Sequence, residues 1–351
     1  MELETFQIIR VLTLTAIAFA IAFSLAPVLI RALEAWGMGK SIRGGKLAPI
    51  FSRLHAKKSG TPTMGGVIVW VTVLFLALLL FYLGQLFPES VFSELNFLSR
   101  GETLLPLGAL IASALVGLVD DYLNVKQLGA AAGGLRVRYR LLIYTAIAIV
   151  GAWWFSAKLD WDLLHIPFAG DFNIGLWYVP FFILVIVATA FSVNESDGLD
   201  GLAAGTLLTS FGAFTVIAFA EGDYDLATFC GVIIGALLAF LWFNINPAKF
   251  FIGDTGAMSL GVTLGIVAML TNSALILPIV GFVFVLTSLS VIAQITWRKL
   301  FKKKLLLSAP LHHHLEAIGW TEPQIVMRMW VISMVMAAIG TAIALLDMLV
   351  S

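Results

Sequence analysis

The sequence predicts an all-α integral membrane protein with about ten transmembrane helices, folded as a single domain over residues 1–351. Three observations carry this prediction. Apolar residues make up 60% of the chain and charged residues only 12%, about half the charged share of an ordinary soluble domain. The mean hydropathy is +0.99. The apolar runs are long and continuous and do not alternate every second residue, which indicates helices and argues against an outer-membrane β-barrel.

Ten apolar runs are about long enough to cross a bilayer. The first ends at Arg31 and is followed by further spans without a small-residue cleavage site, so we expect a retained helix instead of a signal peptide. The single cysteine, Cys230, lies in an apolar run and excludes an internal disulfide or a cysteine metal cage. Pro180 and Pro278 are the candidates for a bend or break. The predicted spans are 8–33, 64–86, 103–119, 141–156, 175–193, 201–220, 226–243, 256–271, 275–297 and 325–347.

Basic residues gather in the odd-numbered connections between these spans. By the positive-inside rule those connections face the cytoplasm, which places both termini outside. The opposite connections are acidic, and the stretch from Lys158 to Asn173 is expected to form a small external hairpin. The even-numbered connections hold only Arg100 and Lys158 as bases. The odd-numbered ones hold Lys40, Arg43, Lys46, Arg53, Lys57, Lys58, Lys126, Arg136, Arg138, Arg140, Lys249, Arg298, Lys299, Lys302, Lys303 and Lys304.

Two adjacent carboxylates, Asp120 and Asp121, close the apolar run from Leu104 to Val119. At the C-terminal end of a helix each acid is disfavoured by roughly 0.3 to 1 kcal/mol, and the two also repel each other. We therefore expect a cation to compensate them, and a membrane-surface site of this kind suits Mg²⁺ and phosphate chemistry. The alternative is a solvated cap beside the basic residues that follow, which are Lys126, Arg136, Arg138 and Arg140.

The other unusual polar stretches fall on the same face. Lys58 to Gly66 is a Gly/Thr/Pro turn before the second span, and amides and hydroxyls at a helix N-terminus suit a phosphate. The stretch taken alone favours the alternative, an ordinary helix-entry turn. In the stretch from Asn194 to Gly201, Asp197 and Asp200 are three residues apart and would share one face of a helical turn, and the glycines let backbone approach a ligand.

Two further stretches complete the set on this face. Asp254 stands between glycines just before the eighth span, where a helix cap is the alternative, and Asn and Phe residues cluster beside it. Three consecutive histidines, residues 312–314, cannot readily converge on one zinc ion. We expect one or two of them to touch phosphate, with a helix-capping turn as the alternative. The run from Arg298 to Lys304 is expected to contact lipid headgroups, and His55 and His165 are expected to be structural.

Residue patterns of several enzyme classes are missing. No Ser-His-Asp order, G-x-S-x-G elbow or Walker A motif occurs. The inner face instead carries carboxylates, lysines, asparagines and glycines on a lipid-facing scaffold. That inventory suits a polyanionic soluble substrate that meets a lipid phosphate.

Five motifs, in this order, resemble those of the phospho-N-acetylmuramoyl-pentapeptide transferase (MraY) family, within the polyprenyl-phosphate N-acetylhexosamine-1-phosphate transferase superfamily. The ten-span plan with both termini outside is similar over essentially the whole chain. The first four motifs are shared with sister transferases, whereas the histidine triplet followed by Glu316 and Gly319-Trp320 resembles this family specifically. The motifs are Gly60–Gly66 (GTPTMGG), Val119–Tyr122 (VDDY), Asp197–Gly201 (DGLDG), Phe251–Asp254 (FIGD) and Pro310–His314 (PLHHH).

The resemblance implies transfer of phospho-MurNAc-pentapeptide from UDP-MurNAc-pentapeptide to undecaprenyl phosphate, giving lipid I and UMP with Mg²⁺. It implies a multi-pass protein of the bacterial cytoplasmic (inner) membrane, a homodimer, and no nucleic-acid partner. It implies that Asp254 holds the metal, that Asp120 and Asp121 handle the lipid phosphate or support the metal, and that His313 is catalytic. The implied substrate-binding residues are Lys58, Thr63, Asn194, Asp197, Asp200, Asn244, Gln294, His312, His314 and Phe251, the last of which stacks on uracil.

Three positions depart from the family pattern. The family usually has Lys where this chain has Asn124 and Arg140, and Asn where it has Phe191. Arg140 keeps the charge but not the compact ammonium group, so these positions bear on how phosphate is bound. The nucleophile is either the undecaprenyl phosphate oxygen directly, which we favour, or an enzyme carboxylate in a two-step route.

Two other functions compete with this interpretation. A sister transferase would use UDP-GlcNAc or a similar sugar and would show no dependence on the pentapeptide. A transporter would place ionisable groups in the middle of its spans, often beside broken helices. The middles of these spans are almost free of charge, which argues against transport.

Overall fold

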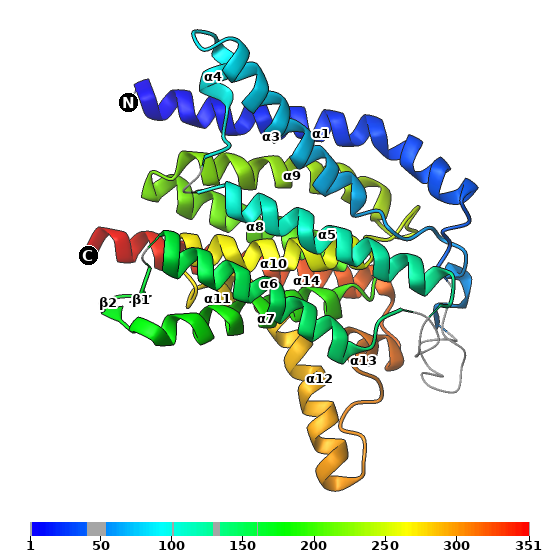
Figure 1. Cartoon of the computed structure of the whole chain (residues 1–351). Coiled ribbons are helices and arrows are strands. Elements are labelled where there is room, and N and C mark those ends of the chain that lie inside the picture. The colour runs from blue at the N-terminus through cyan, green and yellow to red at the C-terminus, as the bar shows by residue number, and fades with distance from the viewer. Residues whose placement is uncertain (1, 41–53, 100–101, 129–133, 160, 351) are drawn as a thin grey trace.

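The computed structural model describes residues 2–40, 54–99, 102–128, 134–159 and 161–350. Within these residues, ten helices are long and apolar enough to cross a membrane, which confirms the predicted number and the multi-pass class. The helices are α1 (Glu2–Ala35), α3 (Val67–Leu86), α5 (Leu104–Val125), α6 (Val137–Lys158), α7 (Tyr178–Ser196), α8 (Leu202–Glu221), α9 (Tyr224–Asn244), α10 (Gly253–Leu270), α12 (Phe282–Phe301) and α14 (Glu322–Val350). Most of them run roughly side by side in one bundle, and α12 projects away from it (Figure 1).

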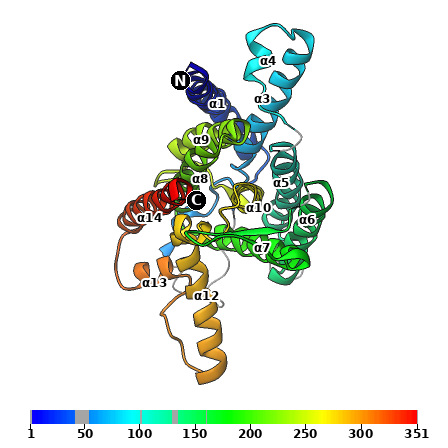
Figure 2. The same cartoon turned by 90° about the vertical axis from the view of Figure 1, so that its left-hand side faces the viewer.

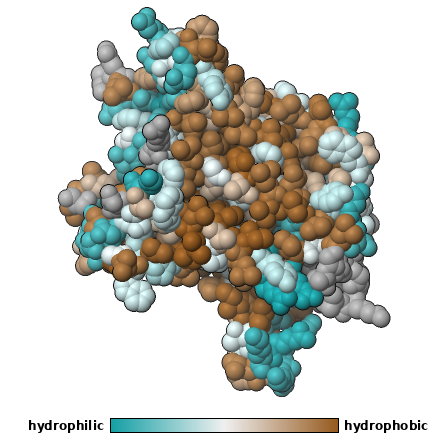
Figure 3. Space-filling view, viewed as in Figure 1, coloured by the Kyte–Doolittle hydropathy of each residue, from teal (hydrophilic) through white to brown (hydrophobic). Residues whose placement is uncertain are grey.

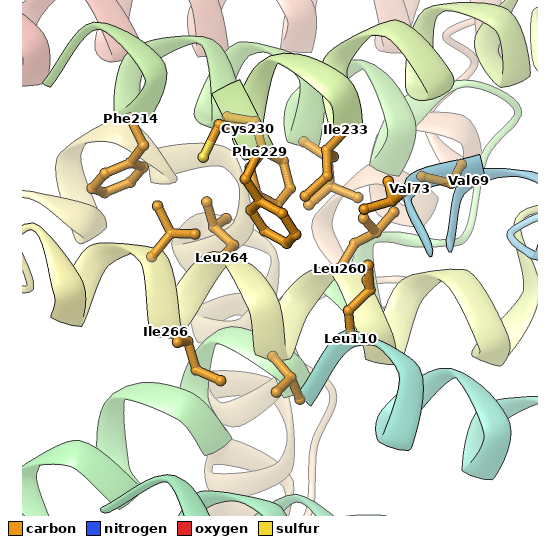
Figure 4. Close-up of a cluster of buried hydrophobic side chains, with 14 of the residues drawn as sticks. Val69, Val73, Leu110, Phe214, Phe229, Cys230, Ile233, Leu260, Leu264 and Ile266 are labelled. Atoms are coloured by element: carbon orange, nitrogen blue, oxygen red, sulfur yellow. The ribbon is translucent and has the colours of Figure 1, made fainter. Parts of the chain in front are cut away.

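Helix α10 lies at the centre of the bundle, as the view along the helices shows (Figure 2). Every residue of α10 except Asp254 is buried. It packs mainly against α5 and α7 and also contacts α3 and α8. Its Leu260 and Leu264 face Phe229 and Ile233 of α9 (Figure 4). Two glycines of neighbouring elements lie close to the backbone of α10: a Cβ added to Gly66 would lie 2.3 Å from the Cα of Gly256, and one added to Gly117 would lie 2.5 Å from the carbonyl oxygen of Asp254. The first turn of α10 is therefore held between α3 and α5.

Apolar side chains cover the sides of the bundle, and polar ones gather toward its ends (Figure 3). Large apolar residues on the outer helices are half exposed or more, among them Leu12 on α1, Leu184 on α7 and Val331 on α14. A soluble monomer rarely leaves so much contiguous apolar surface open. This surface is what a protein solvated by lipid requires.

Two of the predicted spans differ from the helices that form. The third was expected to end at Val119, but α5 continues to Val125, so Asp120 and Asp121 lie within its last turns and not beyond them. The helix continues because cationic and amide partners compensate both carboxylates there. The ninth is broken at Gly281 into α11 (Leu277–Val280) and α12, with Pro278 in the first turn of α11. Helix α12 then leaves the bundle at a steep angle (Figure 1). Pro180, in contrast, lies in the first turn of the continuous α7.

The two ends of the bundle are built differently. The beginning of α1, the end of α14 and a small hairpin of β1 (Leu163–Ile166) and β2 (Gly170–Asn173) share one end, and the hairpin confirms the expectation for residues 158–173. His165 of β1 contacts Asp171 of β2 and Asp347 of α14, so this histidine is structural, as expected. A short helix α4 (Val91–Leu95) also lies at this end. The predicted site residues lie at the other end. Of the basic residues in the connections, Arg43, Lys46, Arg53 and Arg100 lie outside the described part of the chain.

Candidate active site

Arg140, at the start of α6, is the centre of the polar cluster at this end. Its Nε lies 2.7 Å from Asp120 Oδ2 on α5, one terminal nitrogen donates to Asp254 Oδ2 on α10 at 2.9 Å, and the other donates to Asn194 Oδ1 on α7 at 3.0 Å. Asn194 in turn donates through Nδ2 to Asp254 Oδ1 at 2.7 Å. One guanidinium therefore joins residues of three other transmembrane helices, and it is a cation of the kind that the adjacent aspartates were expected to need.

Asp120 and Asp121 leave α5 in different directions. Asp120 is fully buried and accepts a hydrogen bond from the amide of Leu135 through Oδ1 at 2.6 Å. Asp121 accepts from the amide of Thr255 at 3.0 Å and from the hydroxyl of Thr63 at 3.3 Å. A Cβ on Gly253 would lie 2.5 Å from Asp121 Oδ2, and Gly253 has a φ of +71°. Only glycine fits this position, because any side chain would be strained and would also collide with the carboxylate.

Asp254 does not act as a helix cap, which was the alternative considered for it. It lies in the first turn of α10, and the cap residue Ile252 makes no capping side-chain bond. Its carboxylate accepts from Asn194 and Arg140 instead, and its side chain is 12% exposed. Asp254 is thus the one residue of α10 that is not buried, and it places a carboxylate at this end of the bundle.

The turn from Lys58 to Gly66 pairs with the segment before α10. The amide of Phe251 donates to the carbonyl of Pro62 at 2.8 Å, the amide of Gly65 donates to the carbonyl of Phe251 at 2.7 Å, and the amide of Gly66 donates to the carbonyl of Ile252 at 2.8 Å. These glycine amides are therefore not available to cradle a phosphate, which corrects that part of the expectation. What the turn contributes is the hydroxyl of Thr63 and a fixed position for Phe251.

The turn between α7 and α8 is not helical, so the expectation that Asp197 and Asp200 share one helical face is wrong. Asp197 ends α7 with ψ at +55°, and Gly201 takes a left-handed φ of +82°. The backbone reverses here because α8 must pack against α9 inside the bundle. Burial raises the pKa of the Asp197 carboxyl, while the charge of Lys40 nearby opposes that rise. The Nζ of Lys40 also lies 5.5 Å from the ring centroid of Phe251. Lys40 is therefore near both Asp197 and Phe251, two of the predicted substrate-binding residues.

Lys58 and Asp200 belong to a second ionic cluster. Lys58 Nζ lies 2.6 Å from Asp200 Oδ1 and 2.5 Å from Glu322 Oε1 at the start of α14. Asn246 donates to Asp200 at 2.9 Å and to Glu322 at 3.2 Å. No sequence pattern marks Glu322 as a partner of Lys58, because a glutamate in the first turn is common in any helix. The cluster ties the α7–α8 turn and the loop after α9 to the last transmembrane helix.

Two predicted substrate-binding residues bond to backbone instead. Asn244 accepts from the amide of Gly201 at 2.9 Å and donates to the carbonyl of Phe250 at 2.8 Å. Gln294, on α12, accepts from the amides of Leu305 and Leu306 at 3.0 and 2.8 Å. Asn244 therefore joins two loops of the site, whereas Gln294 fastens the chain that returns along α12.

The histidine triplet lies in the short helix α13 (Leu311–Ala317). His313 Nδ1 lies 2.7 Å from Glu316 Oε2, and His55 Nε2 lies 3.1 Å from the same oxygen. Burial raises the pKa of Glu316, but the hydrogen bonds of His313 and His55 outweigh burial and lower that pKa to about 2. His312 is buried beside His313, and this burial lowers its pKa. His314 Nδ1 accepts from the amide of Leu307 at 3.3 Å.

Two groups of side chains have the chemistry to hold a cation. Ligand atoms of His55, His313 and Glu316 lie within 4.8 Å of one another, but hydrogen bonds among them already account for this arrangement. The carboxylates of Asp120, Asp121 and Asp254 offer only oxygen atoms, which is the ligand set that Mg²⁺ prefers. His55 stands alone in the sequence and was expected to be structural, whereas Glu316 was already part of the motif that follows the histidine triplet.

Known proteins resemble this chain over nearly its whole length. The profile described as glycosyl transferase family 4 matches residues 103–272, and phospho-N-acetylmuramoyl-pentapeptide-transferase signature 1 matches residues 58–68. The phospho-N-acetylmuramoyl-pentapeptide-transferase of Chloroflexus aggregans is 38% identical over 350 residues, covering 96% of this chain and 90% of that protein. The enzymes of the same name from Geobacillus sp. (strain WCH70) and Bartonella quintana are 38% and 37% identical, covering 92% and 91% of this chain and 94% and 88% of their own.

Proposed function

The chain belongs to the phospho-N-acetylmuramoyl-pentapeptide-transferase family, and on this premise we propose how its residues carry out the reaction. It is a transferase that passes phospho-MurNAc-pentapeptide from UDP-MurNAc-pentapeptide to undecaprenyl phosphate, which gives lipid I and UMP in the first membrane step of peptidoglycan synthesis. The observation that carries the assignment of residues is the cluster in which Arg140 joins Asp120, Asp254 and Asn194.

We assign Mg²⁺ to Asp254, and we assign Asp120 and Asp121 of α5, whose carboxylates interact electrostatically with that of Asp254, to support it. The donor set fits, because all three side chains offer carboxylate oxygens and Asp254 retains some exposure. When bound, the ion supplies positive charge that stabilises the charge developing on the diphosphate and the UMP leaving group. Arg140 is already in place as a second cation, and its fork of donors suits phosphoryl oxygens.

The chain's own residues then position the two substrates for in-line displacement. Arg140 binds phosphoryl oxygens and orients them, while Asn194 holds the carboxylate of Asp254. An oxygen of undecaprenyl phosphate attacks the phosphorus that bears the MurNAc group, and UMP leaves. We favour this direct attack over a two-step route for two reasons. A phosphate monoester is largely ionised near neutral pH and needs no strong base, and both oxygens of Asp120 already contact a donor, namely the Leu135 amide and Arg140.

The nucleotide belongs on the side of the cluster that holds Phe251, Lys40 and Asp197. The ring of Phe251 is partly exposed and is assigned to stack on uracil, with the charge of Lys40 nearby. His313, held by Glu316, is assigned to the same substrate. The remaining family expectations stay predictions: an inner-membrane location with this end in the cytoplasm, and a homodimer, which the mass of the purified protein in detergent would test.

The first experiment is turnover by the purified protein with undecaprenyl phosphate and Mg²⁺, following UMP release. We expect UDP-MurNAc-pentapeptide to be a substrate and UDP-GlcNAc not to be. Asp254→Asn should abolish turnover with the thermal unfolding temperature unchanged. Glu89→Gln makes the same chemical change at an exposed residue of the opposite end and should have no effect. Turnover of UDP-GlcNAc would move the protein to a sister family, substantial activity of Asp254→Asn would remove that residue's role, and capture of a phosphorylated aspartate would establish the two-step route.

A further inference from the structure

Tyr144 carries a buried hydroxyl for which the described residues supply no hydrogen-bond partner. It lies on α6 one helical turn after Arg140, its side chain is 1% exposed, and its oxygen is shielded from solvent. Leaving a buried hydroxyl unpaired is costly, so such groups are rare and call for a physical explanation. Phenylalanine would fill the same space without that cost. The hydroxyl is therefore available to a ligand that reaches it.

Tyr144 also lines a recess beside the cluster around Arg140. This recess lies between α6 and α7 and is small, about 10 Å³, close to the room that one water molecule needs. Its polar lining includes Arg140, Tyr144, Asn194 and Glu195. Leu141 and Phe191 contribute apolar lining. Helices α6 and α7 form part of the outer wall of the bundle (Figure 2). The lining offers a cation and a hydroxyl beside apolar side chains on the outer wall, which suits one oxygen of an anionic group whose apolar chain lies outside the recess, along the bundle.

We propose that Tyr144 is a substrate-contacting residue whose hydroxyl donates a hydrogen bond to a phosphoryl oxygen of the substrate phosphate bound at Arg140. The proposal rests on the proposed function, and the lining favours the phosphate of the lipid acceptor over the diphosphate of the nucleotide donor. Glu195 repels an anion in the same recess, so the cation of Arg140 and a neutral donor such as Tyr144 are both needed to hold a phosphate there. Asn194 stays bonded to Asp254 and keeps the guanidinium oriented.

The test is Tyr144→Phe, which removes only the hydroxyl oxygen. We expect the KM for undecaprenyl phosphate to rise about tenfold, because a hydrogen bond to a charged group is lost. The KM for UDP-MurNAc-pentapeptide should stay the same. The thermal unfolding temperature should stay the same or rise, because the variant no longer buries an unpaired polar group. A loss of substrate affinity without a loss of stability distinguishes a binding role from a structural one.

Tyr178→Phe is the matched control. Tyr178 is also 1% exposed with a hydroxyl that has no partner among the described residues, but it lies at the opposite end of α7, away from the recess. This variant should leave both KM values unchanged. If it raised the KM for the lipid as Tyr144→Phe does, the effect would belong to tyrosine hydroxyls in this bundle generally, and the proposal would be wrong.

A second measurement is independent of turnover. Undecaprenyl phosphate should raise the unfolding temperature of the wild-type protein more than undecaprenol does, and Tyr144→Phe should remove most of that difference. A rise of the KM for the nucleotide donor instead would support the contact and assign it to the donor's phosphate. Unchanged kinetics with an unchanged response to the lipid phosphate would overturn the proposal. Absence of turnover by the wild type would overturn the proposed function, while the lipid measurement would still decide the role of Tyr144.

Discussion

At the scale of single residues, the replacement of the family's usual lysine by Arg140 determines how the charged cluster is built. A guanidinium has five donors in a rigid plane, whereas an ammonium is a compact point charge. Arg140 uses this width to contact acceptors on α5, α7 and α10 at once. The arginine at this position therefore connects three other helices through one side chain. The same charge compensates the fully buried Asp120.

Arg140→Ala should unfold more easily and lose turnover. Removing one partner leaves the buried carboxylate of Asp120 uncompensated, which typically costs about 3 kcal/mol or more. Arg140→Lys keeps the charge but reaches fewer of the acceptors, so we expect normal stability and a kcat/KM lowered about tenfold, the size of one lost charged hydrogen bond. Thermal unfolding and UMP release measure the two effects. Wild-type stability of the alanine variant would show that Arg140 does not compensate Asp120.

Glu316→Gln should remove part of the acid sensitivity of the protein. The pKa of Glu316 is lowered from 4.5 to about 2, so its stabilising contribution is fully present above pH 4.5 and is lost as the pH falls toward 2. The side chain is only 7% exposed, and the full contribution is of the order of 3 kcal/mol. Between pH 6 and pH 3.5 the unfolding temperature of the wild type should therefore fall further than that of Glu316→Gln. Equal falls would mean that His55 and His313 do not stabilise the carboxylate.

At the scale of elements, the site depends on how closely α3 and α10 approach each other. Gly66 at the start of α3 meets Gly256 of α10 backbone to backbone. This approach allows the Gly65 and Gly66 amides to reach the carbonyls of Phe251 and Ile252, which positions Thr63 beside Asp121. The close packing of α3 and α10 thus determines where Thr63 lies relative to Asp121.

Gly66→Ala should therefore lower both stability and turnover. Its Cβ would lie 2.3 Å from backbone, so the helices must separate, at a cost of about 1 to 3 kcal/mol for overpacking. Gly108→Ala on α5 is the matched control, because no atom lies within 4 Å of the added methyl group. That change should leave turnover normal and stabilise the helix by up to about 1 kcal/mol. If both variants unfold at the wild-type temperature, the glycine contact is not tight.

Helix α12 shows how one element can leave the common direction of the bundle. The chain breaks at Gly281, and α12 projects with large apolar residues such as Leu289, Ile292 and Ile295 exposed (Figure 1). Its basic end agrees with the predicted headgroup contact for the run from Arg298 to Lys304, because these residues are exposed. In lipid the exposed apolar face carries no penalty, which is why a helix with so few neighbours is stable.

At the scale of the whole molecule, the two ends of the bundle carry different groups. One end carries the hairpin and both ends of the described chain, and the other carries the ionic clusters (Figure 1). The charge distribution predicts that the second end faces the cytoplasm, where UDP-linked substrates are made. Membrane-spanning middles almost free of charge agree with a surface reaction and not with a transport path.

Cysteine labelling would test this orientation. Leu176→Cys, at a position 90% exposed at the hairpin end, should react with a membrane-impermeant maleimide added to intact spheroplasts. Lys304→Cys should react only after permeabilisation. The wild-type protein is the control, because its single cysteine, Cys230, is fully buried and should not react. Labelling of Lys304→Cys from outside would invert the predicted topology.

The membrane class, the ten spans, the hairpin and the polar stretches that gather at one end could all be predicted from the sequence, because hydropathy, charge bias and motifs are local properties of the chain. The sequence did not show which charged or polar side chains pair with one another. Arg140 and Asp254 are 114 positions apart, and His55 and Glu316 are 261 apart. Such pairs depend on the approach of helices whose packing no local pattern encodes. For the same reason only the tertiary structure revealed that the glycine amides before α3 are already bonded, that Asp120 belongs to a continuing helix, and that Tyr144 is buried without a partner.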